Sequence, residues 1–318
     1  MTGSAPLPVS AGPSGRHGEP APPSEPVDPA LAEAALLTEV ERLGSVAVAF
    51  SGGVDSAVVL AAAVRALPHG RVVGAIADSP ALARDELALA RRTAEELGAE
   101  LVVLATDELS VDGYRANAGD RCYFCKQTVL GRVSELAAAR GLEHVATGTH
   151  LDDRSAPHRP GLRAARELAV VEPLADAGLT KAAVRAVARH WGLSVSEKPG
   201  MPCLASRIAV GLTVSRDRLH LVEQAEARVQ ATLAEHRVNA RDVRVRLLDR
   251  GFRIELDAPA LRLAEARPGL THALLEGVGA VGPMGTGRLG PYSSGAVSTS
   301  AAGSRTGSAG PAREEPAP

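Results

Sequence analysis

Short apolar runs alternate with longer helical patterns between residues 46 and 147, and this alternation constrains the fold more than any other feature. Apolar runs rich in β-branched residues predict strands at 46–50, 72–77, 101–104 and 144–147. The intervening segments have helical patterns, at 57–67, 82–97 and 123–140. Such an order is typical of a mostly parallel sheet with helices on both faces, in which ligands bind beyond the carboxyl ends of the strands. We therefore expect an α/β domain over residues 29–210.

A different pattern begins after residue 210. A helical pattern over residues 219–236 precedes two alternating apolar runs, Val243–Leu248 and Phe252–Leu256. The runs flank Asp249-Arg250-Gly251, which predicts a hairpin. With a further helix and a late strand, these elements indicate a small α+β domain over residues 211–284.

Both ends of the chain lack the composition of a folded segment. Residues 1–28 and 285–318 are rich in Pro, Gly, Ser and Ala. Such segments bury too little apolar surface to offset the entropy lost on ordering. We expect the first tail to be disordered and the second to be mostly so.

Composition narrows the classes of partner. The formal net charge of −2 gives no general attraction to nucleic acid or acidic membranes. The longest apolar run, Ala57–Val64, is far shorter than the roughly 20 residues that cross a bilayer. The first thirty residues have no basic segment followed by an apolar stretch, so no secretory signal is predicted. Three cysteines without a predicted secretory signal favour reduced thiols over a disulfide scaffold. We expect a cytoplasmic homo-oligomer with no membrane partner and no stable nucleic-acid partner.

The first predicted strand runs into the loop Ser51-Gly52-Gly53-Val54-Asp55-Ser56, and a helix follows directly. Glycines let the backbone approach a ligand closely, and the free amides at a helix start favour an anion. Ser51 and Ser56 add hydroxyl donors. A plain turn with a serine cap is the simpler alternative, but the whole string in this context favours phosphate binding. The loop has no lysine, so it differs from GxxxxGK[ST].

This loop resembles the signature of the PP-loop ATP pyrophosphatases. The resemblance implies that ATP adenylates an oxygen of a substrate and that pyrophosphate leaves. The loop, including Gly52 and Gly53, would then hold the β- and γ-phosphates, with Mg²⁺ neutralising their charge. Asp55 would orient the loop or help to hold that ion. Asp78 and Gly148-Thr149 stand at the ends of two other predicted strands, at the same edge of the sheet. The resemblance implies that Asp78 contacts the nucleotide. The alternative interpretation is that Asp78 is an ordinary helix cap.

The three cysteines allow three interpretations. Cys122 and Cys125 form a CxxC at a predicted helix start, and Cys203 stands in a distant segment. The three thiolates could hold an iron–sulfur cluster with one iron free of protein ligands. Alternatively, Cys203 is a nucleophile or sulfur donor beside a redox-active CxxC. In the third interpretation the thiols are structural or bind zinc without an obvious fourth ligand.

The segment Cys203-Leu-Ala-Ser-Arg207 resembles the cysteine motif of the LarE family of ATP-dependent sulfur transferases. Further matching strings are Arg159-Pro160-Gly161-Leu162-Arg163-Ala164, Gly148-Thr149-His150-Leu151-Asp152-Asp153, Glu172-Pro173-Leu174, and Leu179-Thr180-Lys181 with Arg185. The resemblance covers residues 45–255. It departs at His150, where that family commonly has Asn, and in the weakly matching segment 290–295, which leaves the last strand in doubt.

The resemblance implies a substrate and a product. The substrate is pyridinium-3,5-biscarboxylic acid mononucleotide, of which ATP adenylates a carboxylate. Sulfur then displaces AMP and leaves a thiocarboxylate for the nickel-pincer nucleotide cofactor, which matures lactate racemase. Some members sacrifice their single cysteine, which becomes dehydroalanine; others hold a 4Fe-4S cluster with three. Because all three cysteines are present, the resemblance favours a cluster on Cys122, Cys125 and Cys203.

Basic residues accompany these motifs. Arg244 and Arg246 lie on one face of a predicted strand, and Glu255 lies on the polar side of the next. A solvated charged face is one interpretation; a guanidinium clamp on the substrate's phosphate is the other, which the family resemblance favours. Arg207 and Lys126 are expected to meet a carboxylate or phosphate beside the sulfur source.

We therefore expect an enzyme that transfers sulfur, with ATP, Mg²⁺ and a 4Fe-4S cluster as cofactors. One alternative is a PP-loop enzyme that thiolates tRNA. The near-neutral charge and the lack of a basic, aromatic-rich appendage count against it. The other alternative is a sensor that binds nucleotide or cluster without turnover.

Overall fold

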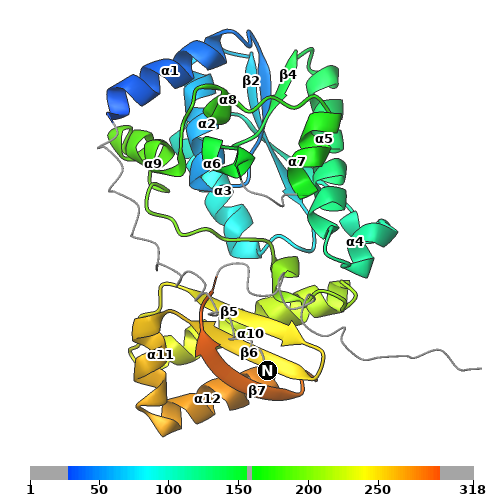
Figure 1. The fold of residues 1–318 in the computed structure, drawn as a ribbon, viewed down its shortest axis with the longest axis vertical. Coiled ribbons are helices and arrows are strands. Elements are labelled where there is room, and N and C mark those ends of the chain that lie inside the picture. The colour runs from blue at the N-terminus through cyan, green and yellow to red at the C-terminus, as the bar shows by residue number, and fades with distance from the viewer. Residues whose placement is uncertain (1–27, 156–159, 294–318) are drawn as a thin grey trace, which may run out of the picture.

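The computed structural model describes residues 28–155 and 160–293, which form a larger α/β unit and a smaller unit below it (Figure 1). The larger unit has a parallel sheet in the order β3-β2-β1-β4. Its strands, in chain order, are β1 (Val46–Ala49), β2 (Val72–Asp78), β3 (Leu101–Ala105) and β4 (His144–Ala146). Val46 of β1 pairs with Val72 on one side and with His144 on the other. The predicted α/β fold class is confirmed.

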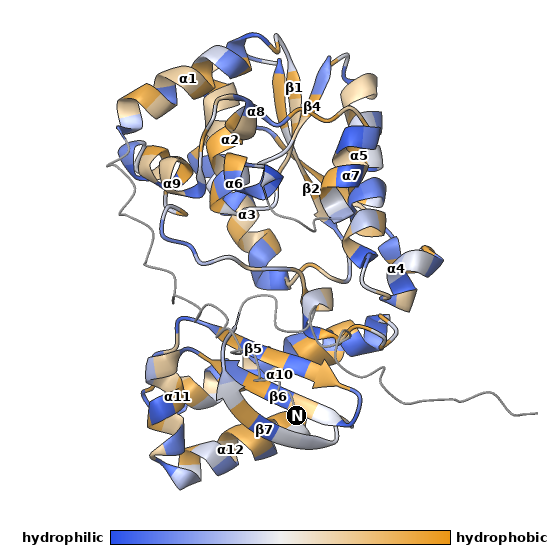
Figure 2. Ribbon diagram, in the orientation of Figure 1, coloured by the Kyte–Doolittle hydropathy of each residue, from blue (hydrophilic) through white to orange (hydrophobic). Residues whose placement is uncertain are grey.

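Helices cover both faces of this sheet, and Figure 2 shows hydrophobic residues along the strands and α2. One core layer is packed by α1 (Pro29–Glu41), α2 (Val54–Ala66), α3 (Arg84–Glu96) and α9 (Lys181–His190). The opposite layer is packed by α5 (Arg121–Ala139) and α7 (Pro160–Glu167). Short turns of helix link them: η1 (Glu108–Ser110), α4 (Asp112–Ala116), α6 (Leu151–Arg154), α8 (Pro173–Asp176) and η2 (Leu204–Arg207).

Helix α2 carries the loop that the sequence singled out. A helix that is apolar on every side is stable only when buried, and nine of its side chains, from Val54 to Ala63, are buried. It begins after Gly53, its N-cap residue. It ends at Leu67, which is extended because Pro68 disfavours a helical residue before it. The core thus fixes the loop before α2 at the carboxyl end of β1.

The smaller unit contains a sheet in the order β5-β6-β7, of which β5 (Val243–Leu248) and β6 (Gly251–Leu256) form the predicted hairpin. Its apolar face packs on α10 (Arg216–Glu235), α11 (Ala258–Glu265) and α12 (Pro268–Gly279). Its other face carries arginines and a glutamate, described below. No helix in the described parts of the chain is long and apolar enough to cross a membrane.

The last strand corrects the expected end of the folded body. Strand β7 (Thr286–Pro291) lies within the tail that was expected from residue 285, and it pairs in parallel with β6. The N–H of Tyr292 still donates to the carbonyl of Leu256 at 2.8 Å. Glycine and proline obscured the strand in the sequence, but backbone pairing with β6 satisfies its polar groups. Residues 294–318 and 1–27 lie outside the described residues.

Leu60 tests the packing of α2 on the sheet. It is fully buried, and a Cβ added at Gly74 of β2 would lie 3.1 Å from its Cδ2. We expect Leu60→Ala to lower the free energy of unfolding by about 2–5 kcal/mol, because the cavity cannot collapse fully. Urea denaturation measures the change. Leu31→Ala on α1 is the control, since Leu31 is 70% exposed; an equal loss in both variants would contradict this core.

Candidate active site

Residues 51–56, here called the phosphate loop, present helix amides to an open space. Gly52 has a left-handed φ of +69°, and a Cβ there would lie 3.0 Å from the Cβ of Ala90, so this position requires glycine. The N–H of Ser51 donates to Ser56 Oγ, which donates to the carbonyl of Gly53, both at 3.1 Å. Within residues 28–155 and 160–293, no side chain caps α2 at Gly53. Its first amides therefore remain available to an anion.

A cavity of about 460 Å³ lies against the phosphate loop, and we call it the loop cavity. It gathers seven of the predicted site residues, which come from the phosphate loop, the start of α5 and the turn after β4. Those that line it are Ser51, Asp55, Ser56, Cys122, Lys126, Gly148 and Thr149. A Cβ at Gly148 would lie 2.7 Å from the Ser56 nitrogen, so glycine permits this close approach of two loops. Gly52 and Gly53 shape the loop without lining the cavity.

Asp55 is paired inside the protein. Both of its carboxylate oxygens lie 2.6 Å from the ammonium of Lys181, at the start of α9. The N–H of Lys181 in turn donates to Asp152 at 2.8 Å. The contact favours the loop-orienting role of Asp55 over metal binding in this state. The sequence marked Lys181 only as part of a motif, because nothing local showed its partner.

The structure does not bring Asp78 into the loop cavity. It forms an ion pair with Arg84 at 2.7 Å and lines a separate hollow of about 490 Å³ with residues of α10. The alternative helix cap is also not formed there, because the N-cap residue of α3 is Ala83. The nucleotide role of Asp78 stays a prediction.

His150, which stands where the family commonly has Asn, has a structural role at the start of α6. It is buried and caps α6, with its N–H donating to Asp153 Oδ2 at 3.3 Å. Its ring Nε2 lies 3.4 Å from the same oxygen. The departure at this position therefore preserves the turn that follows Thr149.

The three cysteines come from two segments that meet between the units. Cys122 and Cys125 are one turn apart at the start of α5, and Cys203 precedes η2. Cys122 and Cys203 are exposed, whereas Cys125 is half-buried. Burial first, then the nearby charges of Cys203 and Glu108, raises the pKa of the Cys125 thiol. Cys125 and Cys203 are thus electrostatic neighbours, although no group of three metal-binding side chains is arranged around an ion site in the described ranges.

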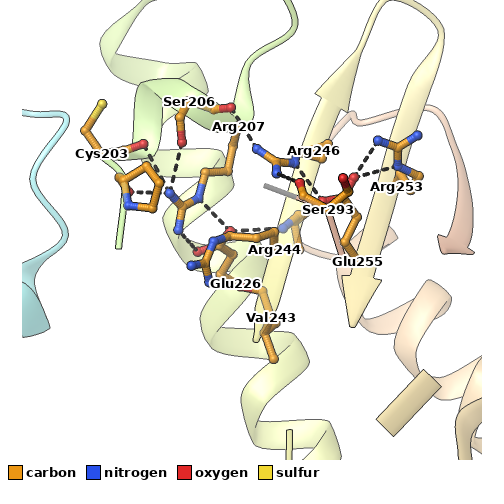
Figure 3. Close-up of polar contacts among 12 residues, drawn as sticks. Cys203, Ser206, Arg207, Glu226, Val243, Arg244, Arg246, Arg253, Glu255 and Ser293 are labelled. Atoms are coloured by element: carbon orange, nitrogen blue, oxygen red, sulfur yellow. Dashed lines mark hydrogen bonds and ion pairs between the residues drawn. The ribbon is translucent and has the colours of Figure 1, made fainter. Parts of the chain in front are cut away.

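Arg207 does not face the loop cavity as expected. Its side chain is 1% exposed, and its guanidinium donates to both oxygens of Glu226, at 2.9 and 3.1 Å (Figure 3). It also donates to the carbonyls of Pro202 and Cys203. This corrects its assignment as a ligand-contacting residue: Arg207 positions the backbone that carries Cys203. Glu226, which the sequence analysis missed, has no signal beyond its place on α10.

Arg244, Arg246 and Glu255 do not form a solvated face, so that interpretation is wrong. All three are buried, and Glu255 accepts hydrogen bonds from Arg246, at 2.9 Å, and from Arg253 (Figure 3). The alternation in the sequence showed which residues share a face of the sheet. It did not show that η2 and the segment before it cover that face, where the carbonyl of Ser206 in η2 accepts a hydrogen bond from Arg246.

Arg244 differs from its neighbours in its partners. Its guanidinium donates to the carbonyls of Val243, at 2.7 Å, and Gly200, at 3.0 Å. Among the described residues no carboxylate pairs with it, and burial together with the positive charge of Arg207 lowers its pKa. A buried guanidinium without a carboxylate suits an anionic group of a ligand.

Comparison with known proteins bears on this arrangement. A pyridinium-3,5-bisthiocarboxylic acid mononucleotide synthase of Lactiplantibacillus plantarum is 33% identical over 236 residues, or 74% of this chain and 82% of that protein. This chain belongs to the LarE family. An uncharacterized protein of Synechocystis is 35% identical to this LarE-family chain over 209 residues, which cover 66% of the chain and 75% of the relative. Residues 31–115 also match the asparagine synthase family model. This LarE-family protein is an ATP-dependent sulfurtransferase.

Gly53 tests the phosphate loop. Its φ of −86° suits any residue, and an added Cβ would meet only Ser51 Oγ, at 3.4 Å. We expect Gly53→Val to fold, but to lose ATP binding because the side chain fills the approach to the helix amides. Calorimetric titration measures the affinity, with Gly269→Val, an open position on α12, as control. Unchanged ATP affinity in Gly53→Val would refute the loop assignment.

Proposed function

We propose that this enzyme adenylates a carboxylate of a pyridinium dicarboxylate mononucleotide and then replaces AMP with sulfur. The product is a thiocarboxylate for the nickel-pincer cofactor of lactate racemase. The observation that carries the proposal is the loop cavity, where the phosphate loop faces Lys126 and Cys122. The relative from Lactiplantibacillus plantarum, named for a pyridinium bisthiocarboxylate mononucleotide, supports this choice of substrate.

The first step is adenylation. A carboxylate oxygen of the substrate attacks the α-phosphorus of ATP, the bond from that phosphorus to the bridging oxygen breaks, and pyrophosphate leaves. The α2 amides and the ammonium of Lys181 stabilise the charge that develops on the leaving group. Mg²⁺ would share that charge beside Asp55, once Lys181 turns from the carboxylate to phosphate.

The second step transfers sulfur. A sulfur nucleophile attacks the acyl carbon of the adenylate, the carbon–oxygen bond to AMP breaks, and the thiocarboxylate forms. Lys126, which lines the loop cavity beside Cys122, is placed to stabilise the negative charge on the carbonyl oxygen. Arg244, with which no carboxylate among the described residues pairs, would bind the phosphate of the mononucleotide, and Arg246, paired with Glu255, would lie on the same face of the sheet.

The three thiols suit a 4Fe-4S cluster in their chemistry. Cys122, Cys125 and Cys203 would hold it, since soft thiolates bind iron and Cys122 and Cys125 lie one turn apart at the start of α5. When bound, the cluster supplies an iron without a protein ligand that can carry an exchangeable sulfide. Arg207 would hold the backbone of the third ligand through the Cys203 carbonyl.

Pyrophosphate release tests the proposed reaction. We expect the purified enzyme with ATP and Mg²⁺ to release pyrophosphate only when pyridinium-3,5-biscarboxylic acid mononucleotide is added. Nicotinic acid mononucleotide, with one ring carboxylate, is the matched control for the second carboxylate. Release that depends on tRNA would instead favour tRNA thiolation, and ATP binding without any release would favour a sensor.

The cysteine variants test the source of sulfur. If three thiolates act as one unit, Cys122→Ala, Cys125→Ala and Cys203→Ala each lose nearly all sulfur transfer and keep pyrophosphate release. Anaerobic iron and sulfide analysis should show loss of the cluster from each, and Ser134→Ala on α5 should retain it. If Cys203 gives up its own sulfur, only Cys203→Ala loses transfer. The spent protein would then be lighter by roughly 34 Da, the mass of H₂S.

A further inference from the structure

Residues 198–203, here called the cysteine segment, connect the α/β unit to Cys203 without regular secondary structure. Cationic side chains hold its backbone at several points. Arg185 of α9 donates to the Lys198 carbonyl, and Arg244 of β5 donates to the Gly200 carbonyl, each at 3.0 Å. Arg207 holds the Cys203 carbonyl at 3.2 Å. The path of the segment is therefore set by contacts with both units.

The side chain of Lys198 joins this segment to the phosphate loop. Its ammonium donates to the carbonyl of Gly52 at 3.0 Å and to Glu86 of α3 at 2.7 Å. The side chains of Lys198 and Glu86 are only 11% and 17% exposed. Because water competes little at such a site, these bonds constrain the segment more than an exposed ion pair would.

The bond to Gly52 also orients an amide of the phosphate loop. The Gly52 carbonyl and the Gly53 N–H belong to one planar trans peptide unit, so they point in opposite directions. By fixing the oxygen on one side, Lys198 fixes the direction of the N–H on the other. Among the described residues that N–H has only a long 3.4 Å contact with Ser51 Oγ, so it remains available to a phosphate oxygen that lies in the fixed direction.

We propose that Lys198 is a positioning residue that couples the phosphate loop to Cys203. A phosphate bound at the loop fixes the Gly52–Gly53 peptide, and the Lys198 bond then holds the cysteine segment in the position shown here. The sulfur-bearing end of the segment is thereby ordered when the nucleotide is present. The inference rests on the proposed function only in taking ATP as the ligand of the loop.

Hydrogen–deuterium exchange with mass spectrometry tests this coupling in the full-length protein, with and without ATP and Mg²⁺. In the unsubstituted protein we expect saturating ATP to slow exchange about tenfold in peptides of the phosphate loop and in a peptide covering residues 199–206. Exchange slows because a hydrogen bond to a charged group becomes more persistent when ATP is bound. In Lys198→Met the loop peptides should still respond at saturating ATP. The response at 199–206 should fall below about twofold, and the ATP affinity should fall about tenfold.

Two further variants separate coupling from general damage. Glu197→Gln is the matched control, because Glu197 is the residue before Lys198 and forms an exposed ion pair with Arg189 at 2.7 Å. It should keep the full response at 199–206. The double variant Lys198→Met with Glu86→Gln leaves no buried carboxylate unpaired, so it provides a folded protein if the single variant is unstable.

The outcomes distinguish this inference from the proposed function. Protection of 199–206 that persists in Lys198→Met at saturating ATP would mean that the nucleotide shields the segment directly, and would overturn the coupling. A protein that binds ATP without any response at 199–206 would also overturn it, with adenylation still possible. If the unsubstituted protein does not bind ATP, both the coupling and the proposed function fall.

Discussion

The buried ion pair between Arg207 and Glu226 is the interaction on which the arrangement around Cys203 depends. One oxygen of Glu226 also accepts the N–H of Val245, at 3.0 Å, so the pair joins α10, η2 and β5. Removing either partner would leave a charge without compensation in a dry site, which is far costlier than losing an exposed pair. The two guanidinium bonds to backbone carbonyls then extend this rigidity to the cysteine. Arg207 thereby determines where the backbone of Cys203 lies.

The larger domain was predictable because its signals are local. Buried parallel strands are continuous apolar runs, and helix α2 is apolar from Ala57 to Val64, so both the order and the type of elements followed from the sequence. The phosphate loop was predictable for a similar reason, because the whole string Ser51–Ser56 stands between a buried strand and a helix, whereas two glycines alone would also fit a plain turn. The strand β7 was not, because a segment of Gly, Arg and Pro has little intrinsic strand preference and forms only against β6.

The partners of charged residues were much less predictable. Alternation placed Arg244 and Arg246 on one face, but the cover of that face comes from a segment about forty residues earlier in the chain. Likewise, the separation of four positions between Cys203 and Arg207 indicated proximity, and only the fold shows that the guanidinium turns toward Glu226. Such pairings depend on tertiary distances, which neither periodicity nor spacing contains.

The pair between Lys181 and Asp55 has a consequence for how a nucleotide approaches. The ammonium of Lys181 is already neutralised by the carboxylate of Asp55 2.6 Å away, so little positive potential extends from this pair into solvent. Under the proposed function, binding of the ATP phosphates would exchange one partner of Lys181 for another, because its ammonium would leave the Asp55 carboxylate and pair with a phosphate. This pair therefore adds little to the dependence of association on ionic strength, whereas the charges of an open basic patch would add much.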